Sequence, residues 1–162
     1  MDKTKKTLKA YQESTLFDRR EQLQPHMSYM HEKERYRVIR EGRVDLIETV
    51  MKIPPDGTAG ILSKNELRNQ KNMLIAAITT FTRSAMDGGL PEELAYAMSD
   101  SYILRGEECT SSAEIDALYD LAFKEFTKAV SEKGVRHYRA QIDAAIRYIA
   151  LHLNEKITLE AV

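Results

Sequence analysis

The sequence contains little of what secreted, membrane or metal-binding proteins depend on. Cys109 is the only cysteine among 162 residues, so neither an intramolecular disulfide nor a site of several thiolates can form. The longest apolar run, residues 73–78, is far shorter than the roughly 20 residues of a membrane-spanning helix. Residues 1–6 lead into a polar stretch without the apolar core of a signal peptide. We therefore expect a cytoplasmic protein with no membrane segment.

Turn-forming residues and a surplus of either charge are also scarce. The seven glycines and four prolines gather at a few places, and the alternation that is typical of half-buried strands is hard to find. Lys and Arg total 24 while Asp and Glu total 25, so the net charge of -1 offers no general basic surface for phosphate contacts. These features favour an all-α protein. Its balanced charge gives by itself no indication of nucleic-acid binding.

The clearest helical pattern follows a loop. Residues 53–60 contain paired prolines and two glycines, which cannot continue a helix. Ser63 and Glu66 have the spacing of a capping box. The apolar stripe that follows consists of Leu67, Leu74, Ile78, Phe81 and Ala85. Further apolar residues widen this stripe to most of the circumference, which predicts a buried central helix over about residues 63–86.

The next break predicts a helical hairpin. Residues 87–89 (DGG) end the central helix, and Pro91 with two following glutamates is typical of a helix start. Because so few residues separate the two helices, we expect them to be antiparallel. The predicted fold is an all-α multi-helix bundle with a buried central helix and an antiparallel helical hairpin.

Other segments complete the bundle. We predict a helix over residues 4–23 and a helical stretch over 27–51 that Gly42 divides or kinks. Ser111 and Glu114 form a second capping-box pattern, and the helix that they open is expected to end at residues 133–134. A last long helix is predicted over residues 138–153, and Thr158 has the character of a cap for one further helix.

The sequence contains no recognisable catalytic or metal motif. His31-Glu32 begins like a metalloprotease motif, but Arg35 stands where the second histidine is needed. No nucleophile elbow, phosphate-binding loop or Glu-x-x-His pattern is present. We therefore predict no enzyme activity, no catalytic residue, no metal ligand and no cofactor.

Arg83 and Asp100 are distinctive for their positions on the two helices of the hairpin. Three interpretations are open: a structural ion pair, a role in an effector pocket, or two side chains that face solvent or cap other groups. Arg83 is about five residues before the turn and Asp100 about eleven after it, which gives an axial mismatch of about 9 Å. This register argues against a tight pair.

Two stretches resemble a family of bacterial transcription regulators. Residues 146–160 (IRYIALHLNEKITLE) are similar to the opening of the AraC-type DNA-binding domain, in which the same step leads into a helix-turn-helix. Residues 60–63 (GILS), 83–89 (RSAMDGG) and 99–103 (SDSYI) resemble Firmicutes members of this AraC/XylS family in which an all-helical region precedes that domain. The resemblance covers roughly residue 60 to the end.

The resemblance implies two domains. Residues 1–136 would form a helical regulatory or sensory domain, and residues 137–162 a linker helix and the first helix of a truncated helix-turn-helix domain. Better-known members have β-rich sensors that nothing here matches, so their sugar-binding residues are not carried over. The recognition helix that enters the major groove is also absent. DNA binding is thus expected only through a C-terminal domain missing from this chain.

The predicted function is regulation of transcription. We expect a homodimer that senses a small-molecule or protein effector and controls sequence-specific DNA binding through its last long helix. The alternative is a standalone helical adaptor whose exposed apolar stripe binds another protein, with Val162 as its natural C-terminus. A helical-bundle enzyme is the third interpretation. It would need a cluster of inward carboxylates or histidines, and the Glu-x-x-His pattern of di-iron proteins is absent from the sequence.

Overall fold

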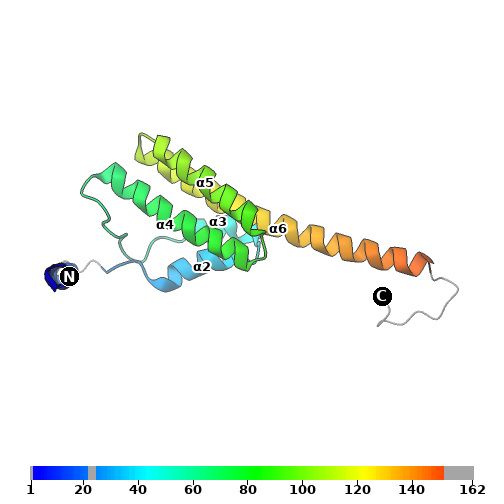
Figure 1. Ribbon diagram of the computed structural model, residues 1–162, viewed down its shortest axis with the longest axis horizontal. Coiled ribbons are helices and arrows are strands. Elements are labelled where there is room, and N and C mark those ends of the chain that lie inside the picture. Colours follow the sequence, from blue (N-terminus) through cyan, green and yellow to red (C-terminus); the bar gives the residue numbers. More distant parts are fainter. Residues whose placement is uncertain (1, 22–24, 152–162) are drawn as a thin grey trace.

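The computed structural model describes residues 2–21 and 25–151. Within these residues the chain forms six α-helices, one short 3-10 helix and no strand, which confirms the predicted all-α class. The elements are α1 (Asp2–Glu21), α2 (Tyr29–Arg40), η1 (Val44–Leu46), α3 (Ile47–Met51), α4 (Glu66–Asp87), α5 (Glu92–Glu108) and α6 (Ser112–Leu151). Figure 1 shows α2 to α6 gathered into a bundle, from which the second half of α6 extends far outward.

α4 is the central helix, because it packs against α2, α5 and α6. Its wide apolar stripe provides the contact surface for these three neighbours. Leu74, Ile78 and Phe81 on that stripe are at most 2% exposed. The prediction of a buried central helix is thereby confirmed. The other buried apolar residues come from every helix of the bundle: Val38, Ile39, Ile47, Val50, Ala85, Leu90, Ala95, Cys109, Ile115, Ala122, Phe123, Phe126 and Val130.

The capping box predicted at Ser63 and Glu66 is wrong. Asn65 is the N-cap of α4, and its side-chain oxygen accepts a 2.8 Å hydrogen bond from the backbone N–H of Arg68. The backbone N–H of Ser63 donates instead to the side-chain oxygen of Asn69 at 3.1 Å. Asn and Ser cap helices about equally well. The hydrogen bond that Asn69 accepts decides between them, because it holds Ser63 outside the helix.

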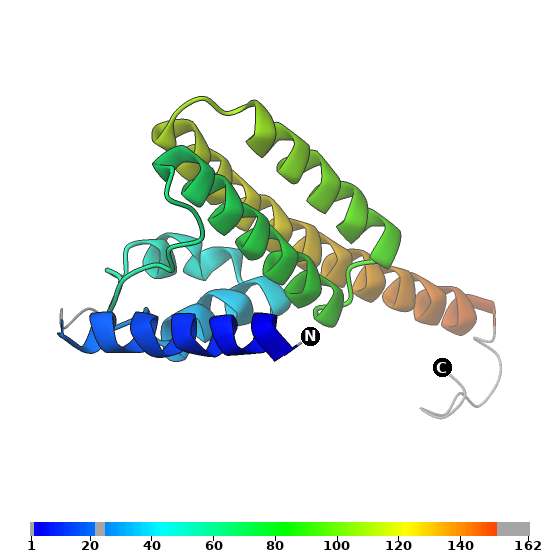
Figure 2. The same cartoon turned by 60° about the vertical axis from the view of Figure 1, so that its left-hand side comes forward.

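α4 and α5 form the predicted antiparallel hairpin: they pack against each other, as Figure 1 shows, and Figure 2 shows the short connection between them. Gly89 closes the turn with a φ of 87°, which glycine adopts without strain. A Cβ atom on Gly88 would collide with the backbone carbonyl of Arg40. The missing side chain therefore lets the end of α2 pack directly against the hairpin turn.

α6 is longer than predicted. It is one helix of 40 residues that continues through Lys133 and Gly134, where we predicted an end. A single glycine inside a helix costs only about 1 kcal/mol relative to alanine, which the flanking helical residues outweigh. The boundary predicted between residues 136 and 137 falls inside this helix. The described part of the helix predicted over 138–153 is the distal part of α6, and the predicted cap at Thr158 lies outside the described residues.

The predicted cap at the start of α6 is present in modified form. The Ser111 hydroxyl accepts a 3.3 Å hydrogen bond from the backbone N–H of Glu114. The Glu114 carboxylate reaches one residue further back than a capping box requires, and accepts a 2.7 Å bond from the N–H of Thr110. This bond is the largest cause of the lowered pKa of Glu114.

α1 is attached to the bundle mainly through the loop over residues 53–60. The Arg19 guanidinium donates to the hydroxyl of Thr58 at 2.9 Å and to the carbonyl of Ala59 at 3.2 Å. Thr58 also exchanges backbone hydrogen bonds with Pro25 and Met27. The helix predicted over 4–23 is confirmed up to Glu21, and its last two residues lie outside the described part of the chain. The stretch over 27–51 divides at Gly42 into α2, η1 and α3 as expected.

Candidate ligand pocket

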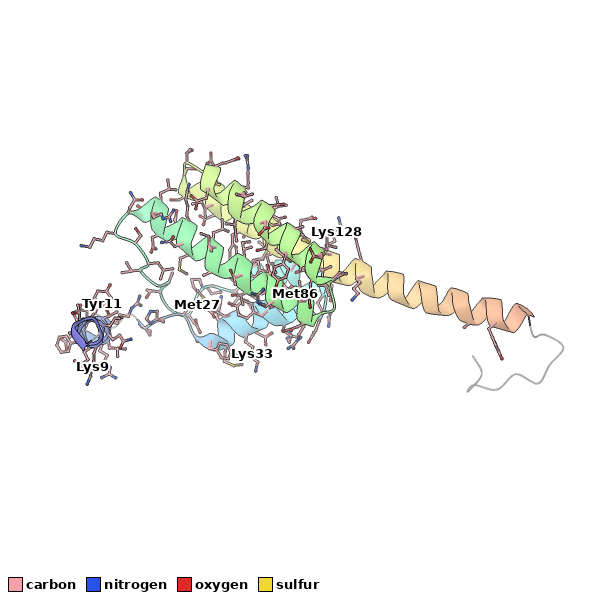
Figure 3. All side chains as sticks on the ribbon, in the orientation of Figure 1. Lys9, Tyr11, Met27, Lys33, Met86 and Lys128 are labelled. Carbon is pink, nitrogen blue, oxygen red and sulfur yellow. The ribbon has the colours of Figure 1, made fainter. Side chains whose placement is uncertain are left out.

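A pocket of about 510 Å³ lies between α2, α4 and α6. This volume is within the range of roughly 300–1,000 Å³ that is typical of small-molecule sites. Figure 3 shows Met27, which lines the pocket, beside the start of α2, while Lys33 on the same helix points away from the bundle. The lining residues are Met27, His31, Glu32, Arg35, Tyr36, Ala59, Gln70, Met73, Leu74, Ala76, Ala77, Thr80, Phe81, Ile115, Asp116 and Tyr119.

The α2 wall presents two nitrogen-bearing side chains. His31 and Arg35 are four residues apart, so they lie on one face of the helix. Arg35 Nη1 donates a 2.7 Å hydrogen bond to the Tyr119 hydroxyl, and its guanidinium carbon lies 5.8 Å from the centre of that ring. Arg37, two residues later, forms ion pairs with both Glu34 and Glu41. Arg35 has no ion pair with any described carboxylate within 4.0 Å, and its guanidinium contacts a neutral phenol instead.

Three buried polar atoms of the pocket residues have no hydrogen-bond partner. They are Nε2 of His31, Nε of Arg35 and Oε1 of Gln70. A buried donor or acceptor that stays unpaired costs about 1–3 kcal/mol. Native proteins satisfy nearly all such atoms with protein groups or ordered water. Three residues of the pocket lining therefore each carry a polar atom that ordered water or a ligand has to satisfy.

The floor of the pocket belongs to the hydrophobic core. Leu74, Phe81 and Ile115 are each at most 3% exposed. The ring of Phe81 lies 5.3 Å from that of Tyr119, with the two planes tilted by 59°. Because this floor is rigid and apolar, it suits the hydrocarbon part of a ligand.

Two phenols in the wall stay protonated at neutral pH. Burial raises the pKa of Tyr119, although Arg35 opposes that shift. Burial also raises the pKa of Tyr36, while a hydrogen bond with Thr80 opposes the shift. Both side chains therefore act as neutral hydroxyl groups that donate and accept hydrogen bonds.

Two carboxylates stand on the solvent side of the pocket. Glu32 on α2 and Asp116 on α6 are both exposed. The Tyr36 hydroxyl donates to the Glu32 carboxylate at 3.3 Å. The pocket thus combines an inner wall with unpaired nitrogen groups and an outer edge of negative charge.

The structure separates the two residues that the sequence singled out. Arg83 and Asp100 are both exposed, neither lines the pocket, and they do not form an ion pair. The guanidinium carbon of Arg83 lies instead 5.6 Å from the ring centre of Tyr96 on α5. This contact joins the two hairpin helices on their outer side.

Sequence reasoning missed the residues that do form the pocket. His31 and Arg35 were considered only as part of a failed metal motif, and Gln70 was not considered at all. One signal was present: the spacing of four residues between His31 and Arg35. A second was the pair Ala76-Ala77, where small side chains interrupt an otherwise large apolar stripe.

Two further searches of the described residues give negative results. No group of three or more His, Cys, Asp or Glu side chains is arranged to hold a metal ion there. Among the described helices, none has both the length and the hydropathy of a membrane span.

By its fold and its pocket, the chain is an all-α bundle with a small-molecule-sized pocket between three helices. No family model, curated protein or solved structure matches the chain.

Proposed function

We propose that this chain is the ligand-sensing regulatory part of an AraC-type transcription regulator. A small molecule in the pocket shifts α6 between two states, and α6 passes that shift to a DNA-binding domain that follows it. Such coupling requires the ligand to bind one state more tightly than the other.

One observation carries the proposal: α6 is both a wall of the pocket and the arm that leaves the bundle. Its first turns contribute Ile115, Asp116 and Tyr119 to the lining. The same unbroken helix continues to Leu151. Residues 146–160, which resemble the start of an AraC-type DNA-binding domain, begin near its end. A change at the pocket therefore has a continuous path to that segment.

The proposal also covers the location and the oligomeric state of the protein. A regulator of this class acts in the cytoplasm and binds paired half-sites as a homodimer. The dimer is tested by the sedimentation-equilibrium mass of the full chain, which would be twice the monomer value. A monomeric mass at high concentration would count against this part of the proposal.

The central test uses the gene product read through to its stop codon. We expect gel-shift experiments with the DNA flanking its own gene to show sequence-selective binding that weakens with salt. Ala77→Phe, which fills part of the pocket, is expected to change that affinity, whereas Ala113→Phe, on an exposed turn outside the pocket, is not. A product that ends at residue 162, or that binds no DNA, would overturn the proposal.

One observation favours the alternative of a helical adaptor. α1 keeps four large apolar side chains at least half exposed, namely Leu8, Tyr11, Leu16 and Phe17. Exposed apolar groups on one helix are typical of a protein-binding surface. If the full gene product binds no DNA, removal of residues 1–21 followed by measurement of partner binding is the experiment that tests this second function.

A further inference from the structure

The α2 wall of the pocket carries unpaired nitrogen groups that a hydrogen-bond acceptor on a ligand would satisfy. Arg35 Nε is a buried donor without a partner, and His31 Nε2 is a second unpaired nitrogen one turn away. Since Arg35 also has no carboxylate partner, an anionic oxygen is the group that satisfies it best. A carboxylate matches the planar guanidinium. Both nitrogens have less than 1 Å² of accessible surface, so a ligand contacts them after a small shift of the neighbouring side chains.

Further polar groups of the pocket are acceptors, which a hydrogen-bond donor on the same ligand would satisfy. Oε1 of Gln70 on α4 is a buried acceptor without a partner. Asp116 and Glu32 add two negative charges at the edge of the same pocket. Among the Asp, Glu and Arg side chains of the lining, these two negative charges exceed the single positive charge of Arg35. A purely anionic ligand such as phosphate would therefore meet net repulsion, whereas a ligand that also bears an ammonium group is attracted at its other end.

The remaining lining is apolar. Met73 and Leu74 on α4, Phe81 about two turns further on, and Ile115 on α6 offer hydrocarbon and aromatic surface. Methionine adapts its shape to irregular apolar groups. A ligand for this surface carries a hydrophobic body between its charged ends.

We propose that the pocket binds an apolar zwitterion: a free hydrophobic α-amino acid or a short hydrophobic peptide. Its carboxylate contacts Arg35 and His31, its ammonium lies toward Gln70 and Asp116, and its side chain covers the apolar floor. This inference rests on the proposed ligand-sensing function and names the chemistry of the signal.

Isothermal titration calorimetry of the full chain tests the inference with five probes: L-phenylalanine, the dipeptide Phe-Phe, 3-phenylpropanoate, phenethylamine and inorganic phosphate. We expect at least one zwitterion to bind, and each phenyl compound with a single charge to bind at least about tenfold more weakly. A preference for phenylalanine or for the dipeptide decides whether an amino acid or a peptide is the source.

Substitutions assign the two ends of the ligand. Arg35→Gln and Asp116→Asn are each expected to weaken zwitterion binding by about tenfold or more. Arg40→Gln and Asp120→Asn, exposed on the same two helices but outside the pocket, are matched controls with unchanged affinity. Asp116 is exposed, so its variant keeps the fold even where Arg35→Gln loosens the contact with Tyr119.

Three outcomes overturn the inference: no probe binds, phosphate binds alone, or 3-phenylpropanoate binds as tightly as phenylalanine. In the first case ordered water satisfies the three buried atoms. None of these results affects the outcome of the DNA-binding test of the full gene product. Conversely, zwitterion binding by a chain that never contacts DNA sustains this inference while the proposed function fails.

Discussion

Arg35 and Tyr119 join two helices across the pocket although they are 84 residues apart in the sequence. Arg35 Nη1 on α2 donates a 2.7 Å hydrogen bond to the hydroxyl of Tyr119 on α6. Because both residues line the pocket, a ligand that contacts Arg35 competes with or reinforces this bond. The bond thus connects the α2 wall of the pocket to its α6 wall.

Tyr119→Phe is expected to lower the free energy of unfolding by about 1–3 kcal/mol, because it leaves a half-buried guanidinium without its hydroxyl partner. Urea denaturation measures this difference. Tyr29→Phe is the control, since Tyr29 is 71% exposed, and its variant should unfold at the wild-type midpoint. Equal midpoints for all three proteins would show that the Arg35–Tyr119 bond contributes no net stability.

Gly88→Ala is expected to destabilise the bundle by about 1–3 kcal/mol through overpacking. The new Cβ would press on the carbonyl of Arg40 and lie 2.8 Å from Cγ1 of Val130. Gly60→Ala is the matched variant, because its Cβ would meet nothing closer than 3.8 Å, at Cδ2 of Leu62. Thermal unfolding compares the two, and an unchanged melting temperature for Gly88→Ala would contradict the close approach of α2 to the hairpin turn.

Glu114 should make stability depend on pH. The hydrogen bond from the Thr110 N–H lowers the pKa of this carboxyl below its ordinary value of 4.5. The unfolded chain therefore takes up the proton first as the pH falls. The stabilisation is complete above pH 4.5 and is lost as the pH falls through the lower folded-state pKa.

The comparison of wild type with Glu114→Gln tests this assignment. We expect the wild type to be the more stable protein at neutral pH and the difference to disappear in acid. Ser111→Ala, which removes the other capping bond, should cost about 0.5–2 kcal/mol at either pH because a hydroxyl does not titrate there. A difference between wild type and Glu114→Gln that stays constant down to pH 2 would refute the pKa shift.

Gly134→Pro should separate sensing from output. Proline inside a helix removes a backbone hydrogen bond and costs about 3 kcal/mol, which interrupts α6 where it leaves the bundle. Ligand affinity, measured by calorimetry, is expected to stay at the wild-type value. The effect of ligand on DNA binding by the full gene product should be lost. Retention of that effect would exclude α6 as the path of the signal.

The sequence predicted those elements whose signals are local. The hairpin follows from Gly88-Gly89 and Pro91, and the central helix from an apolar stripe that is too wide for one neighbour. The helix end predicted at Gly134 was wrong. One glycine destabilises a helix by only about 1 kcal/mol relative to alanine, which does not outweigh the long helical segments on both sides of it. The choice of Ser63 over Asn65 as N-cap failed because Asn69, four residues later, decides between two equivalent caps.

The pocket was beyond the reach of sequence reasoning for a different reason. Its polar atoms come from three helices, and only their packing places Arg35 of α2, Gln70 of α4 and Tyr119 of α6 around one volume. Each of these residues is ordinary in its own helix. Arg83 attracted notice because its position in the hairpin was predictable, but its side chain lies over Tyr96 on the outer surface.

The length of α6 has a mechanical consequence. Close contacts of Gly42 with Ser131 and of Gly88 with Val130 clamp the helix at the edge of the bundle. The residues from Gly134 to Leu151 continue the same helix by about 25 Å at roughly 1.5 Å per residue. A tilt of about 5° at the clamp displaces the far end by about 2 Å, given that helical rise. If α6 transmits a signal, its distal part would therefore act as a lever that enlarges a rearrangement too small to alter the packing of the core.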